Sequence, residues 1–200
     1  MIRLLIATNN IGKQKEIRSL LRNLAVDLMT PDELDLNLMV TEDGTTYSEN
    51  AAKKATSFAK TTGLVCLADD TGLEVEALGG APGLYSARYS PQNNATDADR
   101  RAYLLEQLKN HPRPWKAQFR CIVAIASPPG EVYFTEGICP GVIIPTERGS
   151  HGFGYDPIFH ISSVGKTMAE LSMSEKNTLS HRAIAVNQAI PILMELLGNE

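Results

Sequence analysis

Apolar and polar positions follow one another in blocks along the chain, and the first blocks predict a strand and then a helix. Residues 2–7 form a short apolar run, which is typical of a buried strand. After the polar segment TNNIGK, apolar side chains recur at helical spacing, which places them on one face of a helix. These side chains are Ile17, Leu20, Leu21 and Leu24.

The central blocks predict two more helices, a strand and a hairpin. In TYSENAAKKATSFAKTTG, Thr46 and Glu49 make a capping-box pattern, and Gly63 suits the C-terminal stop. Residues 64–68 are a second apolar run, so we expect a strand that ends where two aspartates follow. A helix is expected from Thr96 onward, and the segments AQFRCIVAIAS and EVYFTEGIC are predicted strands joined by PPG.

The last third of the chain predicts a short extended segment, GVIIP, then a glycine-rich loop, HGFGYDPIF, and two helices. Thr167 with Glu170 predicts the start of a short helix, and Ser180 can cap the last one, in which Pro191 predicts a kink. Because hairpins are mixed with helices, we expect an α/β chain with a mixed β-sheet and flanking helices. A length of 200 residues suits a single domain, residues 1–200.

Charge, cysteines and hydropathy exclude several classes of protein. A net charge of −4 argues against a large nucleic-acid-binding surface, which is normally basic, but is compatible with a local pocket for a small anion. Three cysteines without metal-ligand spacing indicate reduced thiols, so we expect a cytoplasmic protein. No apolar run reaches the roughly 20 residues of a membrane span. The first residues lack the pattern of a signal peptide, and we expect no membrane association.

The segment ATNNIGK stands between the first predicted strand and helix, where backbone amides at a helix N-terminus suit a phosphate group. Lys13 adds a positive charge in the first turn, and Thr8 adds a hydroxyl. A polar turn with a solvated lysine explains the same residues, and the segment taken alone favours that simpler interpretation. The spacing GxxxxGK[ST] of a P-loop is absent.

Two adjacent carboxylates follow the apolar run in LADDTGLEV. Because neighbouring strand residues point to opposite sides, Asp69 and Asp70 are expected to have different roles. One could bind a metal or activate water, and the other could cap the next turn; ordinary turn chemistry is an alternative of equal weight. Mg²⁺ is the natural metal, since one or two carboxylates hold it together with substrate phosphates. Glu42, in the acidic segment TEDGT, is a candidate second carboxylate, although taken alone it reads as an exposed side chain.

Cations gather in SEKNTLSHR, near the start of the last predicted helix. Lys176, His181 and Arg182 oppose the helix dipole there, so an anionic or carbonyl-bearing ligand is one reason for their presence, and a solvated basic turn is the alternative. In HGFGYDPIF, Phe153 can stack on a flat ring and Asp156 can accept from a ring N–H, while the glycines allow close backbone approach. A hydrophobic turn packed on the core is the alternative for this loop.

The ordered set of motifs resembles one family over nearly the whole chain. ATNNIGK, EDGTTYSENA, LADDTGLEVEALGGAPGLYSARYS, GFGYDPIF, GKTMAEL and SEKNTLSHR, in this order, are similar to the inosine triphosphate pyrophosphatase family, also called the Ham1 family, in its bacterial type. Each motif alone is weak, but the set is highly specific. The resemblance implies two lobes around a central substrate cleft and a homodimer. It also implies Mg²⁺-dependent hydrolysis of ITP, dITP and XTP to the monophosphate and pyrophosphate, which cleanses the nucleotide pool.

The resemblance further implies roles for single residues. Asp70 is the implied proton acceptor and metal ligand, Glu42 the second metal ligand, and Lys54 a catalytic residue. Implied triphosphate contacts are Thr8, Asn9, Asn10, Gly12, Lys13, Thr71 and Lys176, and implied base-pocket residues are Phe153, Gly154, Tyr155, Asp156, His181 and Arg182. Asn9 departs from the glycine often found at its position, but asparagine tolerates left-handed backbone better than most residues.

Base choice follows from the chemistry of the purines. Hypoxanthine and xanthine carry a C6 carbonyl and an N1–H, whereas adenine shows an amine and a bare N1, so donors from Arg182 or His181 favour the carbonyl.

A Maf-type nucleotide pyrophosphatase is the nearest alternative, and the FGYD and SHR motifs argue against it. A nucleotide-binding regulator without turnover is a different class, and Asp70 and Glu42 argue against it. A pyrophosphate-release assay separates the enzyme from the regulator.

Overall fold

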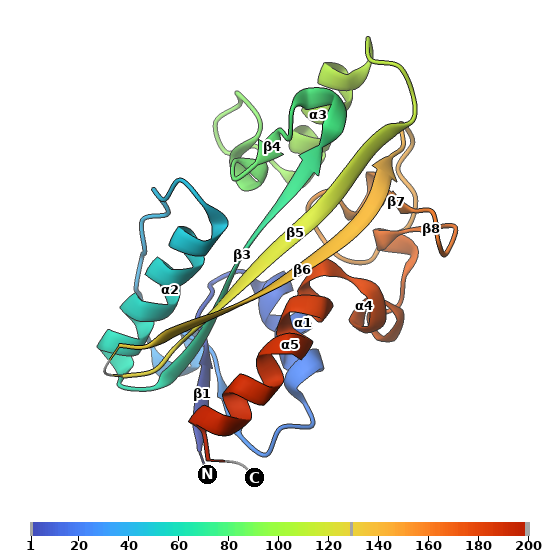
Figure 1. Cartoon of the computed structure of the whole chain (residues 1–200). Helices are drawn as coiled ribbons and strands as arrows, with labels where there is room; N and C mark the ends of the chain where they lie inside the picture. Colours follow the sequence, from blue (N-terminus) through green and yellow to red (C-terminus); the bar gives the residue numbers. More distant parts are fainter. Residues whose placement is uncertain (1, 129, 199–200) are drawn as a thin grey trace. The chain divides into compact units, whose positions relative to one another are not determined.

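A computed structural model describes residues 2–128 and 130–198 and confirms the mixed α/β fold (Figure 1). Its helices are α1 Ile11–Leu21, α2 Tyr47–Thr62, α3 Asp97–Leu108, α4 Met173–Leu179 and α5 His181–Leu196. Its strands are β1 Arg3–Ile6, β2 Asp27–Met29, β3 Val65–Val75, β4 Pro82–Gly83, β5 Trp115–Ala126, β6 Val132–Ile143, β7 Phe159–Ile161 and β8 Lys166–Thr167. None of the described helices is long and apolar enough to cross a membrane.

Within the described residues the strands form one sheet in the order β2-β1-β3-β5-β6-β7-β8, with β4 paired to β3. Strand β1 pairs in parallel with β2 and β3, whereas β4, β7 and β8 each pair antiparallel with a neighbour. The sheet is therefore mixed, as the predicted combination of hairpins and helices requires.

Local signals set the ends of the helices much as the sequence predicts. The hydroxyl of Thr46 accepts from the N–H of Glu49 at 3.1 Å and caps α2, which ends at Gly63 with a left-handed φ of 70°. The hydroxyl of Ser180 accepts from the N–H of Ala183 at 3.1 Å and caps α5. Helix α5 continues through Pro191 to its last residue without interruption.

Two predicted strand boundaries are wrong. Strand β3 does not end at the two aspartates but continues through them to Val75, because Leu73 and Val75 point into the core and extend the alternation. Strand β6 extends to Ile143 and so includes the first three residues of the segment GVIIP, residues 141–145, which was expected to be separate. The predicted hairpin is confirmed, since β5 and β6 are neighbours, and Pro129 of its PPG turn lies outside the described residues.

The chain divides into two compact units, and β3, β5 and β6 contribute residues to both. The first unit comprises the described parts of Met1–Asp70, Cys121–Gly137 and Ser180–Glu200, and the second comprises Thr71–Arg120 and Ile138–Leu179. The substrate cleft and the single-domain organisation expected from the sequence stay predictions.

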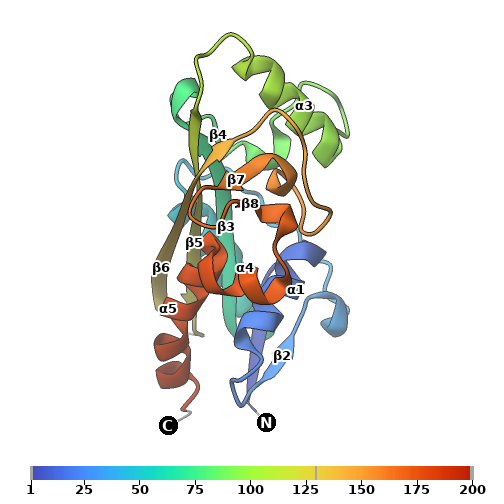
Figure 2. The ribbon, with the colours of Figure 1, turned by 90° about the vertical axis from the view of Figure 1, so that its right-hand side faces the viewer.

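In the first unit, helices cover both faces of the sheet. Successive residues of β1 point to opposite faces, so Leu4 and Ile6 pack with α1 and α5, whereas Leu5 and Ala7 pack with α2. Helices α1 and α5 lie side by side on their face (Figures 1 and 2). The same alternation in the neighbouring strand β3 directs Asp69 towards α1 and α5, and Asp70 towards α2.

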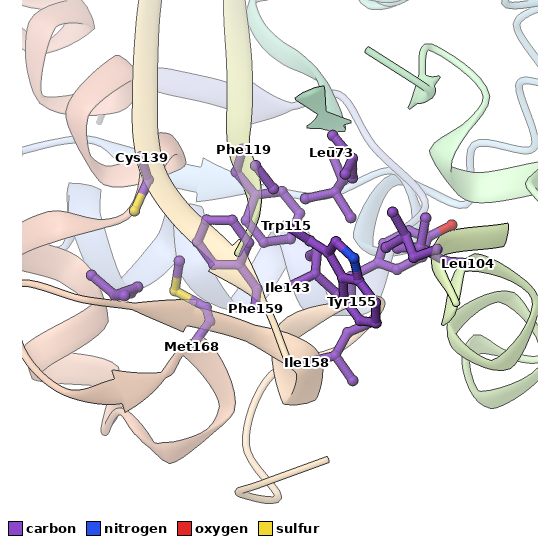
Figure 3. Close-up of a cluster of buried hydrophobic side chains, with 14 of the residues drawn as sticks. Leu73, Leu104, Trp115, Phe119, Cys139, Ile143, Tyr155, Ile158, Phe159 and Met168 are labelled. Atoms are coloured by element: carbon purple, nitrogen blue, oxygen red, sulfur yellow. The ribbon is translucent and has the colours of Figure 1, made fainter. Parts of the chain in front are cut away.

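The core of the second unit is built around aromatic side chains from β5, β7 and the glycine-rich loop (Figure 3). The rings of Phe119 and Phe159 lie 4.5 Å apart at an angle of 52°. Tyr155 is part of this buried cluster together with Leu104 of α3. The glycine-rich loop HGFGYDPIF is therefore anchored in the core by Tyr155 and, where it enters β7, by Phe159.

Candidate active site

The predicted site residues form two clusters, one within each compact unit. In the first unit, a loop of residues 7–10 joins β1 to α1, and the carboxamide oxygen of Asn10 caps that helix by accepting from the N–H of Lys13 at 3.0 Å. The hydroxyl of buried Thr8 accepts from the N–H of Asn10 at 3.2 Å. These bonds shape the loop, in which Asn9 is exposed and Gly12 half-buried.

Asp69 is the centre of a buried network of ion pairs in the first unit. Its Oδ2 accepts from Nε and Nη2 of Arg182 at 3.2 and 3.0 Å and lies 3.0 Å from Nζ of Lys13. Arg182, only 1% exposed, also donates to Glu16 on α1. Burial alone would lower the pKa of Arg182, but the carboxylates of Asp69 and Glu16 outweigh it and raise the pKa. The structure thus places the guanidinium between two carboxylates.

Asp70 faces α2, where it meets two side chains that lie four residues apart on the same helical face. Its Oδ1 lies 3.5 Å from Nζ of Lys54, and its Oδ2 accepts from the amide of Asn50 at 3.3 Å. Burial raises the pKa of Asp70, and the positive charges of Lys54 and Lys13 only partly offset this. A carboxylate with a raised pKa is a stronger base than an exposed aspartate.

Lys54 stays protonated at neutral pH. Burial would lower the pKa of its ammonium, but Asp70, Asp69 and Glu42 together outweigh burial and raise it. The neighbouring Lys53 lies outside this cluster, because its ammonium pairs with Asp43 at the exposed surface.

A loop before α2 brings Glu42 to the same ammonium. Its Oε2 accepts from Nζ of Lys54 at 3.1 Å. The loop is held by Gly44, whose N–H donates to Oδ1 of Asn50 at 2.8 Å. A Cβ at Gly44 would stand 2.6 Å from that oxygen, so only glycine allows the close approach.

The residues around Lys54 fit a magnesium ion that is completed by substrate. Carboxylate oxygens of Glu42 and Asp70 lie at 3.1 and 3.5 Å from one cationic nitrogen, so both are directed at the same positive charge. Among the described residues, no three His, Cys, Asp or Glu side chains gather into a metal-binding group. Two carboxylates suffice for Mg²⁺, which keeps waters and takes phosphate oxygens as its other ligands.

The second unit holds the other cluster, formed by the loop 152–156 and α4. Oδ2 of Asp156 accepts from the ammonium of Lys176 at 2.6 Å and from the N–H of Phe153 at 3.1 Å. The same ammonium lies 5.5 Å from the centre of the Phe153 ring. Gly152 has a φ of 77°, and a Cβ there would stand 1.9 Å from Oδ2 of Asp156, so a side chain would displace the carboxylate.

Tyr155 anchors this loop and does not present its hydroxyl to solvent. The hydroxyl donates to the carbonyl of Ser86 at 2.9 Å, and the ring is 4% exposed in the core (Figure 3). Burial raises the pKa of Tyr155 above its usual value. A base contact for Tyr155, which the resemblance implied, would therefore involve its backbone.

The structure separates residues that the sequence grouped. Lys176 belongs to α4 and lies with Asp156, whereas His181 and Arg182 open α5 and are buried in the first unit. Thr71 follows Asp70 within β3. Sequence reasoning missed Glu16 and Asn50. Their signals were present, because Glu16 adjoins Ile17 on the buried face of α1, and Asn50 precedes Lys54 by one helical turn.

Known proteins resemble the chain over its full length. The profile of the Ham1 family matches residues 4–192. A dITP/XTP pyrophosphatase of Geobacter sulfurreducens is 46% identical over 199 residues, which cover 99% of this chain and 98% of the relative. A dITP/XTP pyrophosphatase of Escherichia coli O157:H7 is 44% identical over 203 residues and the full length of both chains. A HAM1 protein structure from Coxiella burnetii superposes with a TM-score of 0.86 at 40% identity, over 98% of this chain and 100% of that one.

Proposed function

Because the chain belongs to the Ham1 family, we propose that it hydrolyses dITP, ITP and XTP to the nucleoside monophosphate and pyrophosphate. The family assignment argues against the Maf-type alternative. The observation that carries the proposal is the arrangement of the carboxylates of Asp70 and Glu42 around the ammonium of Lys54. It supplies a base, a positive charge and a place for a metal, which cleavage of a phosphoanhydride requires.

Asp70 is the proposed proton acceptor. The oxygen of a water molecule attacks the α-phosphorus, the bond from that phosphorus to the α–β bridging oxygen breaks, and the bridging oxygen leaves with the electron pair as part of pyrophosphate. Asp70 takes the proton of the attacking water, and burial has raised its pKa towards the range of a useful general base. Lys54 contributes charge beside the reacting phosphate and not proton abstraction, since its pKa is raised.

Glu42 and Asp70 are the residues that we propose to hold Mg²⁺. When bound, Mg²⁺ neutralises triphosphate charge and makes attack by water easier. Lys13, paired with Asp69, adds positive charge at the start of α1. The remaining proposed triphosphate contacts are Thr8, Asn9, Asn10, Gly12 and Thr71.

The second-unit cluster supports recognition of a 6-oxopurine. Hypoxanthine offers a donor, N1–H, next to an acceptor, O6. Asp156 offers an acceptor and Lys176 a donor, and these two groups lie 2.6 Å apart. Because of this pairing, we propose a base contact for Lys176 in place of the triphosphate contact that the resemblance implied. Adenine presents the reverse order, an acceptor at N1 and a donor at its 6-amino group. Its binding would leave Asp156 and Lys176 without matching partners, so adenine is strongly disfavoured. Phe153 is the proposed stacking partner, with Gly154 and Tyr155 shaping its loop, while base contacts of His181 and Arg182 stay proposals from the resemblance.

A panel of nucleoside triphosphates tests the proposal. The protein is incubated with Mg²⁺ and dITP, XTP, dGTP or dATP, and the products are separated by chromatography. We expect dITP and XTP to yield monophosphate and pyrophosphate in equal amounts, and dATP to be cut far more slowly. Stepwise release of orthophosphate would contradict the reaction type, and equal rates for all four would contradict the proposed base recognition.

Two further proposals are a homodimer, which the family resemblance implies, and a cytoplasmic location, which the three cysteines without metal-ligand spacing indicate. Light scattering coupled to size-exclusion chromatography tests the first, with a mass near twice 21.8 kDa expected. Fractionation of cells that express the native protein tests the second.

A further inference from the structure

Two side chains of α3 bind both backbone polar groups of Gly154. The N–H of Gly154 donates to Oδ2 of Asp97 at 2.7 Å, and its carbonyl accepts from Nη1 of Arg101 at 2.8 Å. Asp97 and Arg101 are four residues apart, so they lie on one face of the helix. Gly154 directly follows Phe153, the proposed stacking residue, and helix α3 therefore holds the loop immediately beside that ring.

Both side chains are themselves fixed. Nε and Nη2 of Arg101 donate to the two carboxylate oxygens of Glu147 at 2.8 and 2.9 Å, a fork that sets the plane of the guanidinium. Asp97 is the first residue of α3, where the positive end of the helix dipole favours a carboxylate. Burial would raise the pKa of Asp97, but hydrogen bonds from Arg100 and the N–H of Gly154 outweigh it and lower the pKa.

The loop is also held from the side of α4, so Phe153 lies between two fixed points. Its N–H donates to Asp156, which is bonded to Lys176, and the next residue is bonded to α3. Gly154 has a φ of 61°, and a Cβ there would meet nothing within 4 Å. The hydrogen bonds from α3 are thus the contacts that hold the backbone at Gly154 itself, next to Tyr155, which is anchored in the core.

We propose that Asp97 and Arg101 are positioning residues that orient Phe153 against the purine base through Gly154. This inference rests on the proposed function and adds to it a determinant of base binding that no sequence motif revealed. Neither side chain needs to touch the substrate. Because a displacement of about 1 Å in a binding group can cost about 100-fold in rate, loosening this loop is expected to affect substrates that use the base.

The test compares Asp97→Ala and Arg101→Met with Asp99→Ala. Asp99 belongs to the same first turn and forms the capping box of α3 with Thr96, but its bonds are to Thr96 and not to Gly154. It therefore controls for mere weakening of the helix. Four quantities are measured for each variant well below its unfolding temperature, namely kcat and KM for dITP, the Ki of inorganic tripolyphosphate as a baseless competitor, and the hydrogen exchange rate of the Gly154 amide.

We expect Asp97→Ala and Arg101→Met to raise KM for dITP about 10-fold or more, with the Ki of tripolyphosphate within about twofold of wild type. Exchange at Gly154 should accelerate in Asp97→Ala and stay unchanged in Asp99→Ala. An unchanged KM, or an equal loss in Asp99→Ala, would overturn the inference while leaving the proposed function intact. A wild-type protein that does not hydrolyse dITP would overturn the proposed function. Independently of activity, an unchanged exchange rate of the Gly154 amide in Asp97→Ala would overturn the proposal that α3 holds Gly154.

Discussion

One carboxylate oxygen of Asp69 accepts two hydrogen bonds from the guanidinium of Arg182, at 3.2 and 3.0 Å, in the buried interior of the first unit. This pair connects the middle of β3 with the first turn of α5. The two adjacent aspartates therefore have different partners. Asp69 pairs with Arg182 and Lys13 on one face of the sheet, whereas Asp70 lies beside Lys54 on the other.

Replacing Arg182 by methionine should destabilise the protein severely. The change leaves the buried carboxylates of Asp69 and Glu16 without their main cation, and breaking a buried pair in this way costs roughly 3–5 kcal/mol. Arg18→Met is the matched control, because Arg18 pairs with Glu33 at the exposed surface and should cost about 1 kcal/mol or less. Urea denaturation gives both free energies of unfolding.

The same variant decides whether Arg182 also contacts the base. If the guanidinium serves only Asp69 and Glu16, kcat/KM for dITP and for dATP should fall together. A selective loss on dITP would show that Arg182 reaches the base carbonyl and that the ion pairs do not exhaust its role.

Asp70→Asn should abolish turnover and preserve binding. The amide keeps the size of the side chain but can neither accept the proton of water nor offer a negative charge to Mg²⁺, and loss of a positioned base alone costs about 10²–10⁴-fold in kcat. Calorimetric titration with dITP measures binding, and chromatography measures turnover. Near wild-type kcat would make Asp70 a structural residue and would move the search for the base to its neighbours.

Lys54→Met should lower kcat strongly, whereas Lys53→Met should not. Lys54 is buried beside Asp70 and Glu42, but its neighbour pairs with Asp43 at the surface. We expect a loss of about 100-fold or more for the first variant, comparable with removal of one charge-stabilising group, and an effect within about twofold for the second. Similar losses in both would contradict the assignment.

Gly152→Ala should weaken dITP binding more than backbone strain alone would, because the new side chain also displaces Asp156. Its Cβ would collide with the carboxylate of Asp156 at 1.9 Å, and its φ of 77° already disfavours alanine. Gly165→Ala isolates the second effect, because Gly165 has a φ of 68° but open space around the new Cβ, so it should cost only about 1–2 kcal/mol of stability. A KM for dITP that rises equally in both variants would contradict displacement of Asp156.

The contribution of Asp97 to stability should disappear at acid pH. Its pKa in the folded protein lies below the ordinary value, so its carboxylate stabilises the folded state above the unfolded pKa of about 3.9, and this stabilisation is lost as the pH falls through the folded value. Wild type should therefore be more stable than Asp97→Asn at pH 6, and the difference should shrink steadily below pH 4. Denaturation curves of both proteins across this range measure it, and a constant difference would indicate that the charge is irrelevant.

The sequence by itself determined those features that depend on neighbours along the chain. Three such features act over only a few residues and can therefore be predicted without knowing the fold. They are the capping residues Thr46 and Ser180, the alternation that separates Asp69 from Asp70, and the glycines of the loop before Asp156. The family resemblance likewise rested on the order of short motifs. The length of β3 was misjudged because the two aspartates looked like a strand end, whereas buried partners allow charged residues to remain inside a strand.

Only the tertiary structure decided which charges meet. Arg182 and Glu16 are 166 residues apart, and Arg101 and Gly154 are 53 apart, so no local pattern indicates that either pair is in contact. The same holds for the grouping of Lys176 with Asp156 and not with Arg182, although the latter is much nearer in sequence. The physical reason is that an ion pair or hydrogen bond depends on distances of a few ångströms, and these are set by how strands and helices pack, which the spacing of residues along the chain does not specify.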